Sequence, residues 1–408
     1  MFDWGAIDNL WGIETTEEHR LAHISIASAG SKLRAPQSGS LTADHQCTES
    51  LVYTAAGRRS GQERGFTRSS ESSSQRNGQD GVSGCWAFFE LEMSMRRYWF
   101  LMSLLVTSFA IHAAPAPDAQ SPRVVYHTQQ VNGMNIFYRE AGSKNSPTIV
   151  LLHGFPSSSH MFRDLIPKLA GHYHIIAADM PGYGYSDMPA VDKFTYTFDS
   201  IANVMDQFLD SLRVKKYSVY IQDYGAPIGF KLLLKHPDRI QAIISQSGNA
   251  YEEGLGDFWA QFIFPYWKNK TPENAQKVLG LLTLDTTKFQ YSKGFPHPEW
   301  VSPDSYTFDQ MTLDRPGNHE IQLALAYDYQ NNVKQYPQWH EALRATKVPV
   351  LCVWGKNDPI FIAPGAEAYK KDSPDAEIHF VDSGHFALED QSVAIAHYIL
   401  AFLPKHVH

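Results

Sequence analysis

Short apolar runs alternate with helical stretches over the later two thirds of the chain. The runs that read as strands, each followed by a helical stretch, span residues 148–152, 174–179, 218–222, 242–247, 348–355 and 377–381. Continuous apolar strands with intervening helices are typical of a mostly parallel sheet that is covered by helices on both faces. We therefore predict an α/β fold.

Two further segments depart from this alternation. Residues 124–131 and 134–140 read as strands joined by Asn132-Gly133, a pair that favours a tight hairpin turn. Between residues 249 and 345 the alternation stops and the sequence becomes aromatic and helical. We expect this segment to be a helical cap inserted between a first core part, residues 114–248, and a second core part, residues 346–408.

The first 113 residues have a different character. Residues 1–92 show no sustained period, and residues 57–84 are crowded with Ser, Gly, Arg and Gln, which indicates a disordered or mis-called upstream segment. Residues 93–113 combine a basic start, an apolar run and small residues, as a secretory signal peptide does. The apolar run is shorter than the ~20 residues that span a bilayer, so we expect no stable membrane span in the mature form.

A signal peptide must lie at the N-terminus to work. We therefore expect Met93 or Met95 to be the true start and the protein to be secreted or periplasmic. The alternative is a disordered tail that precedes an internal membrane anchor.

Charge and cysteine content narrow the class of function. The formal net charge is −8, and no run of Lys and Arg is interleaved with aromatic residues, which argues against a nucleic-acid partner. Cys47 and Cys85 belong to the upstream segment, and Cys352 lies in an apolar strand, where an inert thiol is expected.

Polar motifs follow the predicted parallel strands. The first is His153-Gly154-Phe155-Pro156, the second spans residues 179–187, the third is Gln222-Asp223-Tyr224-Gly225, and the last two contain Asp358 and His385. Because ligands bind at the carboxyl ends of strands in open α/β sheets, these motifs predict one shared site.

Asp223 stands where a strand runs directly into a helix. On such a turn a nucleophile points into the pocket, and Gly225 is small because the helix packs closely against the strand. The backbone N–H groups of Tyr224 and Phe155 are the predicted oxyanion donors. Ile221 is larger than usual for its position, and taken alone Asp223 would be read as a helix N-cap.

With these motifs in this order, residues 124–403 resemble the α/β-hydrolase fold in its aspartate-nucleophile branch, which includes epoxide hydrolases and haloalkane and fluoroacetate dehalogenases. The resemblance implies a triad of Asp223, Asp358 and His385. A carboxylate is ionised at neutral pH, so Asp223 can attack a saturated carbon without a base and form an ester. His385, oriented by Asp358, would then activate the water that hydrolyses this ester. No Gly-x-Ser-x-Gly occurs, which argues against a serine esterase.

The resemblance also bears on the leaving group. Epoxide hydrolases of this branch hold the ring oxygen with cap tyrosines, and Tyr329 stands in a segment that resembles theirs, with Tyr266 or Tyr251 as a second donor. Haloalkane dehalogenases use a tryptophan after the nucleophile and an asparagine or a second tryptophan, and fluoroacetate dehalogenases use an arginine. Tyr224 and Phe155 occupy those positions here. We therefore predict hydrolysis of an epoxide to a diol.

Other classes of function stay open. A haloalkane or haloacid dehalogenase, a hydrolase of another small electrophile such as a lactone, and a binding protein on the same fold are the alternatives. No metal and no cofactor is expected, because His319-Glu320 and His340-Glu341 lack a second histidine and Gly182-Tyr183-Gly184 lacks a third glycine. The predicted partner is a small-molecule substrate, and the sequence makes no prediction of the oligomeric state.

Overall fold

The structure is a computed structural model that describes residues 122–407. The upstream segment 1–92 and the signal peptide 93–113 lie outside the described residues, so the expectations about start, secretion and anchor stay expectations.

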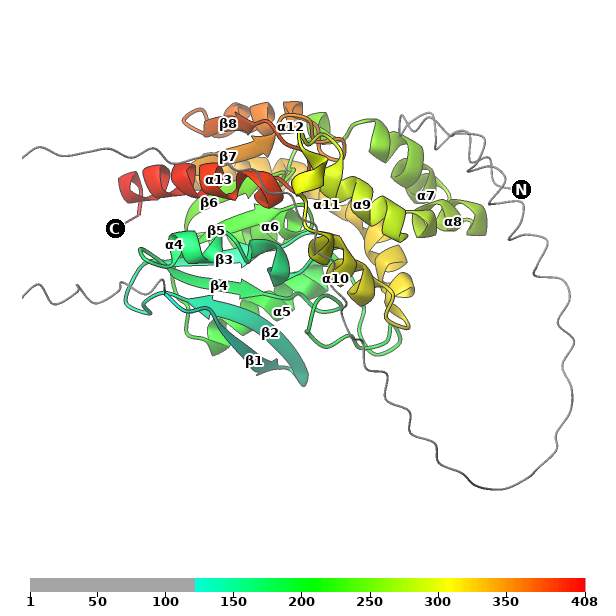
Figure 1. Ribbon diagram of the computed structural model, residues 1–408, viewed down its shortest axis with the longest axis horizontal. Coiled ribbons are helices and arrows are strands. Elements are labelled where there is room, and N and C mark those ends of the chain that lie inside the picture. Colours follow the sequence, from blue (N-terminus) through cyan, green and yellow to red (C-terminus); the bar gives the residue numbers. More distant parts are fainter. Residues whose placement is uncertain (1–121, 408) are drawn as a thin grey trace, which may run out of the picture. The chain divides into compact units, whose positions relative to one another are not determined.

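An eight-stranded sheet forms the centre of the protein (Figure 1). β1 pairs with β2, and β2 with β4, in antiparallel fashion, and the later strands pair in parallel. The spatial order is β1-β2-β4-β3-β5-β6-β7-β8. The strands are β1 (Val125–Val131), β2 (Met134–Ala141), β3 (Thr148–Leu152), β4 (His174–Ala178), β5 (Tyr217–Gln222), β6 (Ile240–Gln246), β7 (Val350–Gly355) and β8 (Glu377–Val381). The predicted α/β fold and its opening hairpin are confirmed.

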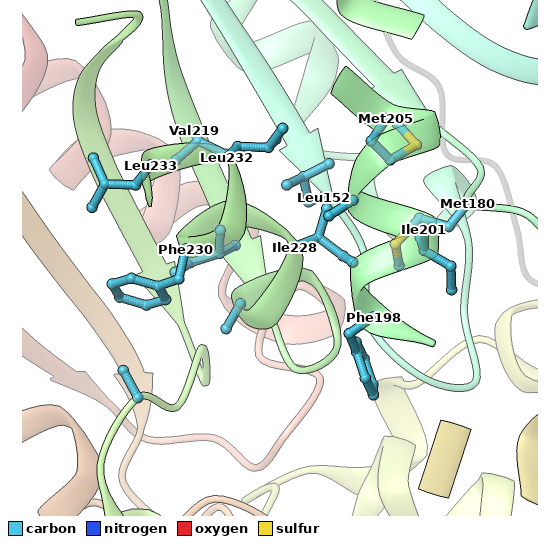
Figure 2. Packing of buried hydrophobic residues seen from close by; sticks show 14 of the residues in the cluster. Leu152, Met180, Phe198, Ile201, Met205, Val219, Ile228, Phe230, Leu232 and Leu233 are labelled. Carbon is cyan, nitrogen blue, oxygen red and sulfur yellow. The ribbon is translucent and has the colours of Figure 1, made fainter. Parts of the chain in front are cut away.

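Helices cover both faces of the sheet because successive strand residues point to opposite sides. Val150 and Leu152 of β3 belong to one hydrophobic core, and Ile149 and Leu151 belong to the other. α5 (Phe198–Ser211) and α6 (Gly225–Lys235) contribute to the first core (Figure 2). α4 (Ile166–Leu169) and α13 (Leu388–Phe402) contribute to the second core. The short helix α12 (Pro364–Ala368) follows β7.

The segment between β6 and β7 is helical and lies at one end of the strands (Figure 1). Its main helices are η3 (Trp259–Ile263), α7 (Phe264–Lys268), α8 (Pro272–Gly280), α9 (Leu284–Ser292), α10 (Pro303–Leu313) and α11 (Asn318–Thr346). Trp259, Tyr329 and Trp339 of this cap are buried in the same core as α5 and α6. Cap and sheet are therefore packed as one body. Within residues 122–407 no helix is long and apolar enough to cross a membrane.

Candidate active site

Asp223 occupies a sharp turn between β5 and α6. Its φ is +48°, in the left-handed region that residues other than glycine rarely adopt. Such a conformation costs on the order of 1–3 kcal/mol and persists where the surroundings fix it. Here the carbonyl oxygen of Asp223 accepts from the Ala226 N–H at 3.0 Å, and α6 begins at Gly225. The turn therefore exposes a carboxylate at the start of a helix.

Two glycines on α6 let the helix approach the sheet this closely. A Cβ on Gly225 would lie 2.2 Å from the Leu152 carbonyl oxygen, so only glycine fits there. A Cβ on Gly229 would lie 2.5 Å from Cγ2 of Ile221. The large side chain that looks unusual on the strand is therefore accommodated by the missing side chain of Gly229.

The structure brings Asp223, Asp358 and His385 together, although they come from the ends of three different strands. Nδ1 of His385 lies 2.9 Å from Oδ2 of Asp358, and its Nε2 lies 3.8 Å from Oδ2 of Asp223. The other oxygen of Asp358 accepts from the backbone N–H groups of Ile360 and Phe361, at 2.8 and 3.1 Å. These contacts fix the orientation of the imidazole and direct Nε2 toward Asp223.

The two predicted oxyanion donors converge on one atom. The backbone N–H groups of Phe155 and Tyr224 both donate to Oδ1 of Asp223, at 2.7 and 2.5 Å. Oδ1 is thereby held, while Oδ2 faces the imidazole and is free to react. If the Asp223 carboxyl group were esterified through Oδ2, negative charge developing on Oδ1 would already face two donors.

The motif after β3 holds its loop in place. The peptide bond between Phe155 and Pro156 is cis. Nδ1 of His153 donates to the Gly154 carbonyl oxygen at 3.0 Å, and its Nε2 accepts from the Met180 N–H at 3.0 Å. Burial lowers the pKa of His153 to about 4, so the ring is neutral and serves as a structural link between two loops.

Burial and neighbouring charges tune the reacting groups. Burial raises the pKa of Asp223 to about 6, although His385 and the two backbone N–H groups act in the opposite direction. Burial acts to lower the pKa of His385, but the carboxylates of Asp358 and Asp223 outweigh it and raise this pKa. At neutral pH Asp223 is therefore mainly ionised and ready to act as a nucleophile.

A mostly apolar cavity opens directly over Asp223. Its volume is about 40 Å³, which leaves room for a molecule of a few heavy atoms. Phe155 and Tyr224 flank the carboxylate, and cap residues form the rest of the lining together with Ile360. The cap residues are Phe258, Trp259, Ile263, Val278, Leu281, Leu282, Gln290, Gln322 and Ala326.

None of the three candidate cap tyrosines is part of this lining. The Tyr251 hydroxyl instead donates to Asp372 at 3.0 Å. Tyr329 is fully buried and packs its ring behind Tyr224, with centroids 5.8 Å apart. Tyr266 is buried against the edge of Tyr327, with centroids 5.5 Å apart. The structure therefore brings the triad and the oxyanion donors into one site, with Tyr329 in the layer behind it and Tyr266 against Tyr327.

Two glutamines beside the histidine were not singled out from the sequence. The Gln222 amide lies 3.0 Å from Nε2 of His385, and the Gln246 amide donates to the His385 carbonyl oxygen at 2.8 Å. Their positions at the ends of β5 and β6 were the available signal. Within residues 122–407 no group of three metal-binding side chains occurs.

Comparison with known proteins bears on the family and the fold. The model of the α/β-hydrolase fold family matches residues 147–392. An uncharacterized hydrolase of Saccharomyces cerevisiae is 46% identical over 286 residues, which are 69% of this chain and 98% of the yeast protein. A haloalkane dehalogenase of Psychrobacter cryohalolentis is 28% identical over 287 residues, 66% of this chain and 88% of the relative. A solved epoxide hydrolase without ligand shares the fold, with a TM-score of 0.57 and 20% identity over 69% of this chain and 99% of the other chain.

Proposed function

The chain belongs to the α/β-hydrolase fold family and is a hydrolase related to haloalkane dehalogenases, and we propose that it hydrolyses a small epoxide through an ester on Asp223. One observation carries the proposal. The Asp223 carboxylate has one oxygen held by two backbone N–H groups and the other 3.8 Å from His385.

The first step is displacement at carbon. Oδ2 of Asp223 forms a bond to one ring carbon, the bond from this carbon to the ring oxygen breaks, and the electron pair goes to that oxygen. The resulting alkoxide takes a proton from the Tyr224 hydroxyl. A carboxylate suits this step because it is ionised without help from a base.

The second step is hydrolysis of the ester. His385 removes a proton from a water molecule, which attacks the carbonyl carbon of Asp223, and the oxyanion on Oδ1 is stabilised by the Phe155 and Tyr224 N–H groups. Collapse expels the product alkoxide, which takes the proton from His385. The regenerated carboxylic acid then ionises, and its proton restores the Tyr224 hydroxyl. The sum is one epoxide and one water converted to one diol.

The donors around the cavity favour an epoxide over a halide. Tyr224 lines the cavity, and its hydroxyl makes no hydrogen bond to any other residue in the range 122–407. A hydroxyl can give a proton to an alkoxide, which a halide ion does not need. Trp259 also lines the cavity, but its indole N–H donates to the Ile360 carbonyl oxygen at 2.9 Å. The Phe155 side chain has no hydrogen-bond donor. Because Tyr224 lines the cavity and Tyr329 and Tyr266 do not, Tyr224 is the better candidate for the proton donor.

A haloalkane dehalogenase is the second candidate. The relative that is 28% identical over most of its length carries that name, and the two steps on Asp223 apply equally to a carbon–halogen bond. The difference lies in what leaves: halide departs from the protein, whereas the ring oxygen stays attached to the trapped ester.

The test traps the ester. Replacing His385 with glutamine removes the base of the second step, so the variant should accumulate the ester at mildly alkaline pH. The variant is mixed with propylene oxide or with propyl bromide, and its intact mass is measured. Addition of the whole epoxide mass at Asp223 supports the proposal, and a propyl adduct with free bromide supports the second candidate. No adduct with either compound would overturn the assignment of Asp223 as nucleophile for small epoxides and haloalkanes.

A further inference from the structure

We propose that Gln290 is a catalytic residue whose side-chain N–H donates a hydrogen bond to the leaving group as the bond to carbon breaks. The inference rests on the proposed function, because it assigns a role in the displacement at Asp223. It adds to the Tyr224 hydroxyl a second donor from the cap, at a residue that no sequence motif marks.

Gln290 is the uncommitted polar side chain on the cap side of the cavity. The cap contributes two polar residues to the lining, Gln290 and Gln322. Both polar atoms of the Gln322 amide already have protein partners, since its Oε1 accepts from the Tyr183 hydroxyl and its Nε2 donates through one of its two N–H groups to Asn318, both at 2.8 Å. Gln290 is only 4% exposed, and its amide makes no hydrogen bond to any residue between 122 and 407.

The amide atoms of Gln290 are not closed off from the cavity, because they are not among the fully buried polar atoms that lack a partner between residues 122 and 407. A polar group that lines a cavity and has no protein partner is available to bind a ligand there. Gln290 faces the same cavity as Asp223. The bound substrate therefore supplies the partner that the protein lacks.

The neighbouring residue fixes α9 over the reacting groups. The ring of Tyr291 is stacked on Phe386, the residue after His385, with centroids 4.0 Å apart. The Tyr291 hydroxyl also donates to the carboxylate of Asp309 and lies 3.4 Å from the Ser157 hydroxyl. Ser157 belongs to the loop that carries the Phe155 N–H. The end of α9 is thus attached to the two loops that supply the base and one oxyanion donor.

The direction of the displacement agrees with this placement. A nucleophile that attacks a saturated carbon approaches from the side opposite to the leaving group. Asp223 and its oxyanion donors belong to the sheet side of the cavity, so the leaving group points toward the cap. Of the polar cap residues that line the cavity, Gln290 is the one whose amide makes no hydrogen bond within residues 122–407.

The chemistry divides the work between two groups. An amide N–H stabilises negative charge by a hydrogen bond but cannot give up its proton, whereas the Tyr224 hydroxyl can. Gln290 therefore acts on any leaving group that gains negative charge, oxygen or halide. A substitution of Gln290 should slow displacement for both classes of substrate and leave hydrolysis of the ester unchanged.

The decisive experiment separates the two steps. Gln290→Met keeps the length of the side chain and removes both polar atoms. In the His385→Gln background we expect the rate of ester formation from propylene oxide, followed by intact mass, to fall about 10- to 100-fold, as expected for loss of one hydrogen bond to a charged group. With His385 present, the decay of the ester after rapid mixing should be unchanged within twofold.

Gln276→Met is the matched control, because Gln276 lies on the exposed side of α8 in the same cap. Its rates should equal those of the parent. Equal rates of ester formation with and without Gln290 would overturn the inference while the proposed function stands. Slowed decay of the ester, with formation unchanged, would overturn it as well. Absence of any ester when Gln290 is intact would instead overturn the proposed function.

Discussion

The carboxylate of Asp223 and the imidazole of His385 lie 3.8 Å apart, and both side chains are shielded from solvent. Attraction between the ionised forms lowers the pKa of Asp223 and raises that of His385. Burial disfavours the charged form of both groups. For Asp223 burial is the larger of the two effects, so the net pKa is raised to about 6. The nucleophile and the base therefore titrate as a coupled pair.

The first prediction concerns the pH dependence of ester formation. Only the carboxylate form of Asp223 attacks, so the rate should rise with pH and level off above about 6. Below that value it should fall about tenfold for each pH unit. In His385→Gln the attraction is lost, so the midpoint should move to higher pH. Rapid-quench measurement of the ester in both proteins checks this, and an unshifted midpoint would contradict the coupling.

The second prediction concerns the nucleophile itself. Asp223→Asn should abolish turnover, by at least about 10⁴-fold, because an amide cannot form the ester. Asparagine tolerates positive φ and still presents an oxygen to the Phe155 and Tyr224 N–H groups. The thermal midpoint of unfolding should therefore be no lower than that of the parent. If the variant lost its folded structure as well as its activity, the result would indicate a structural role for Asp223 and not a catalytic one.

The third prediction compares two tyrosines. Tyr224 lines the cavity and Tyr329 does not, so Tyr224→Phe should slow ester formation from propylene oxide about 10²- to 10⁴-fold, as loss of a general acid does. Tyr329→Phe should change it by less than threefold. With propyl bromide the Tyr224 effect should be smaller, because bromide needs no proton. If Tyr329→Phe slowed ester formation and Tyr224→Phe did not, Tyr329 and not Tyr224 would be the proton donor.

The sequence predicted those parts of the protein that local patterns determine. The strand-helix alternation was sufficient for the fold, and Asp223, Asp358 and His385 could be grouped because each follows a strand of one parallel sheet. The cap was harder, because α9 and α11 carry many aromatic residues and no clean apolar face. Tyr329 is predicted as a donor because its segment resembles that of a cap tyrosine in epoxide hydrolases, and this resemblance does not show which way the side chain faces. Whether a cap side chain faces the cavity depends on contacts such as Tyr291 on Phe386, which join segments far apart in the chain.

One of the buried carboxylates outside the triad, Asp309, has a strongly raised pKa. Asp309 on α10 is buried, accepts from the Tyr291 hydroxyl through Oδ2, and has no partner for Oδ1 among residues 122–407. Burial raises its pKa from 3.8 to about 7, although hydrogen bonds from Tyr291 and Ser157 act in the opposite direction. Glu389, which is paired with Arg163 at 2.7 Å, adds to the rise. The folded protein thus binds this proton more tightly than the unfolded chain.

The last prediction follows from that difference in proton binding. A carboxyl group with a raised pKa in the folded state contributes stability that is fully present below pH 3.8 and is lost as the pH rises to about 7. The asparagine in Asp309→Asn cannot ionise. The free energy of unfolding of this variant should therefore rise relative to that of the parent as the pH increases over this window. A rise of about three units in the pKa of Asp309 corresponds to a change of up to about 4 kcal/mol in the free energy of unfolding. Denaturant unfolding of both proteins from pH 4 to 8 measures the difference, in which the other titrating groups cancel. A difference that stays constant with pH would mean that Asp309 is not protonated in the folded protein.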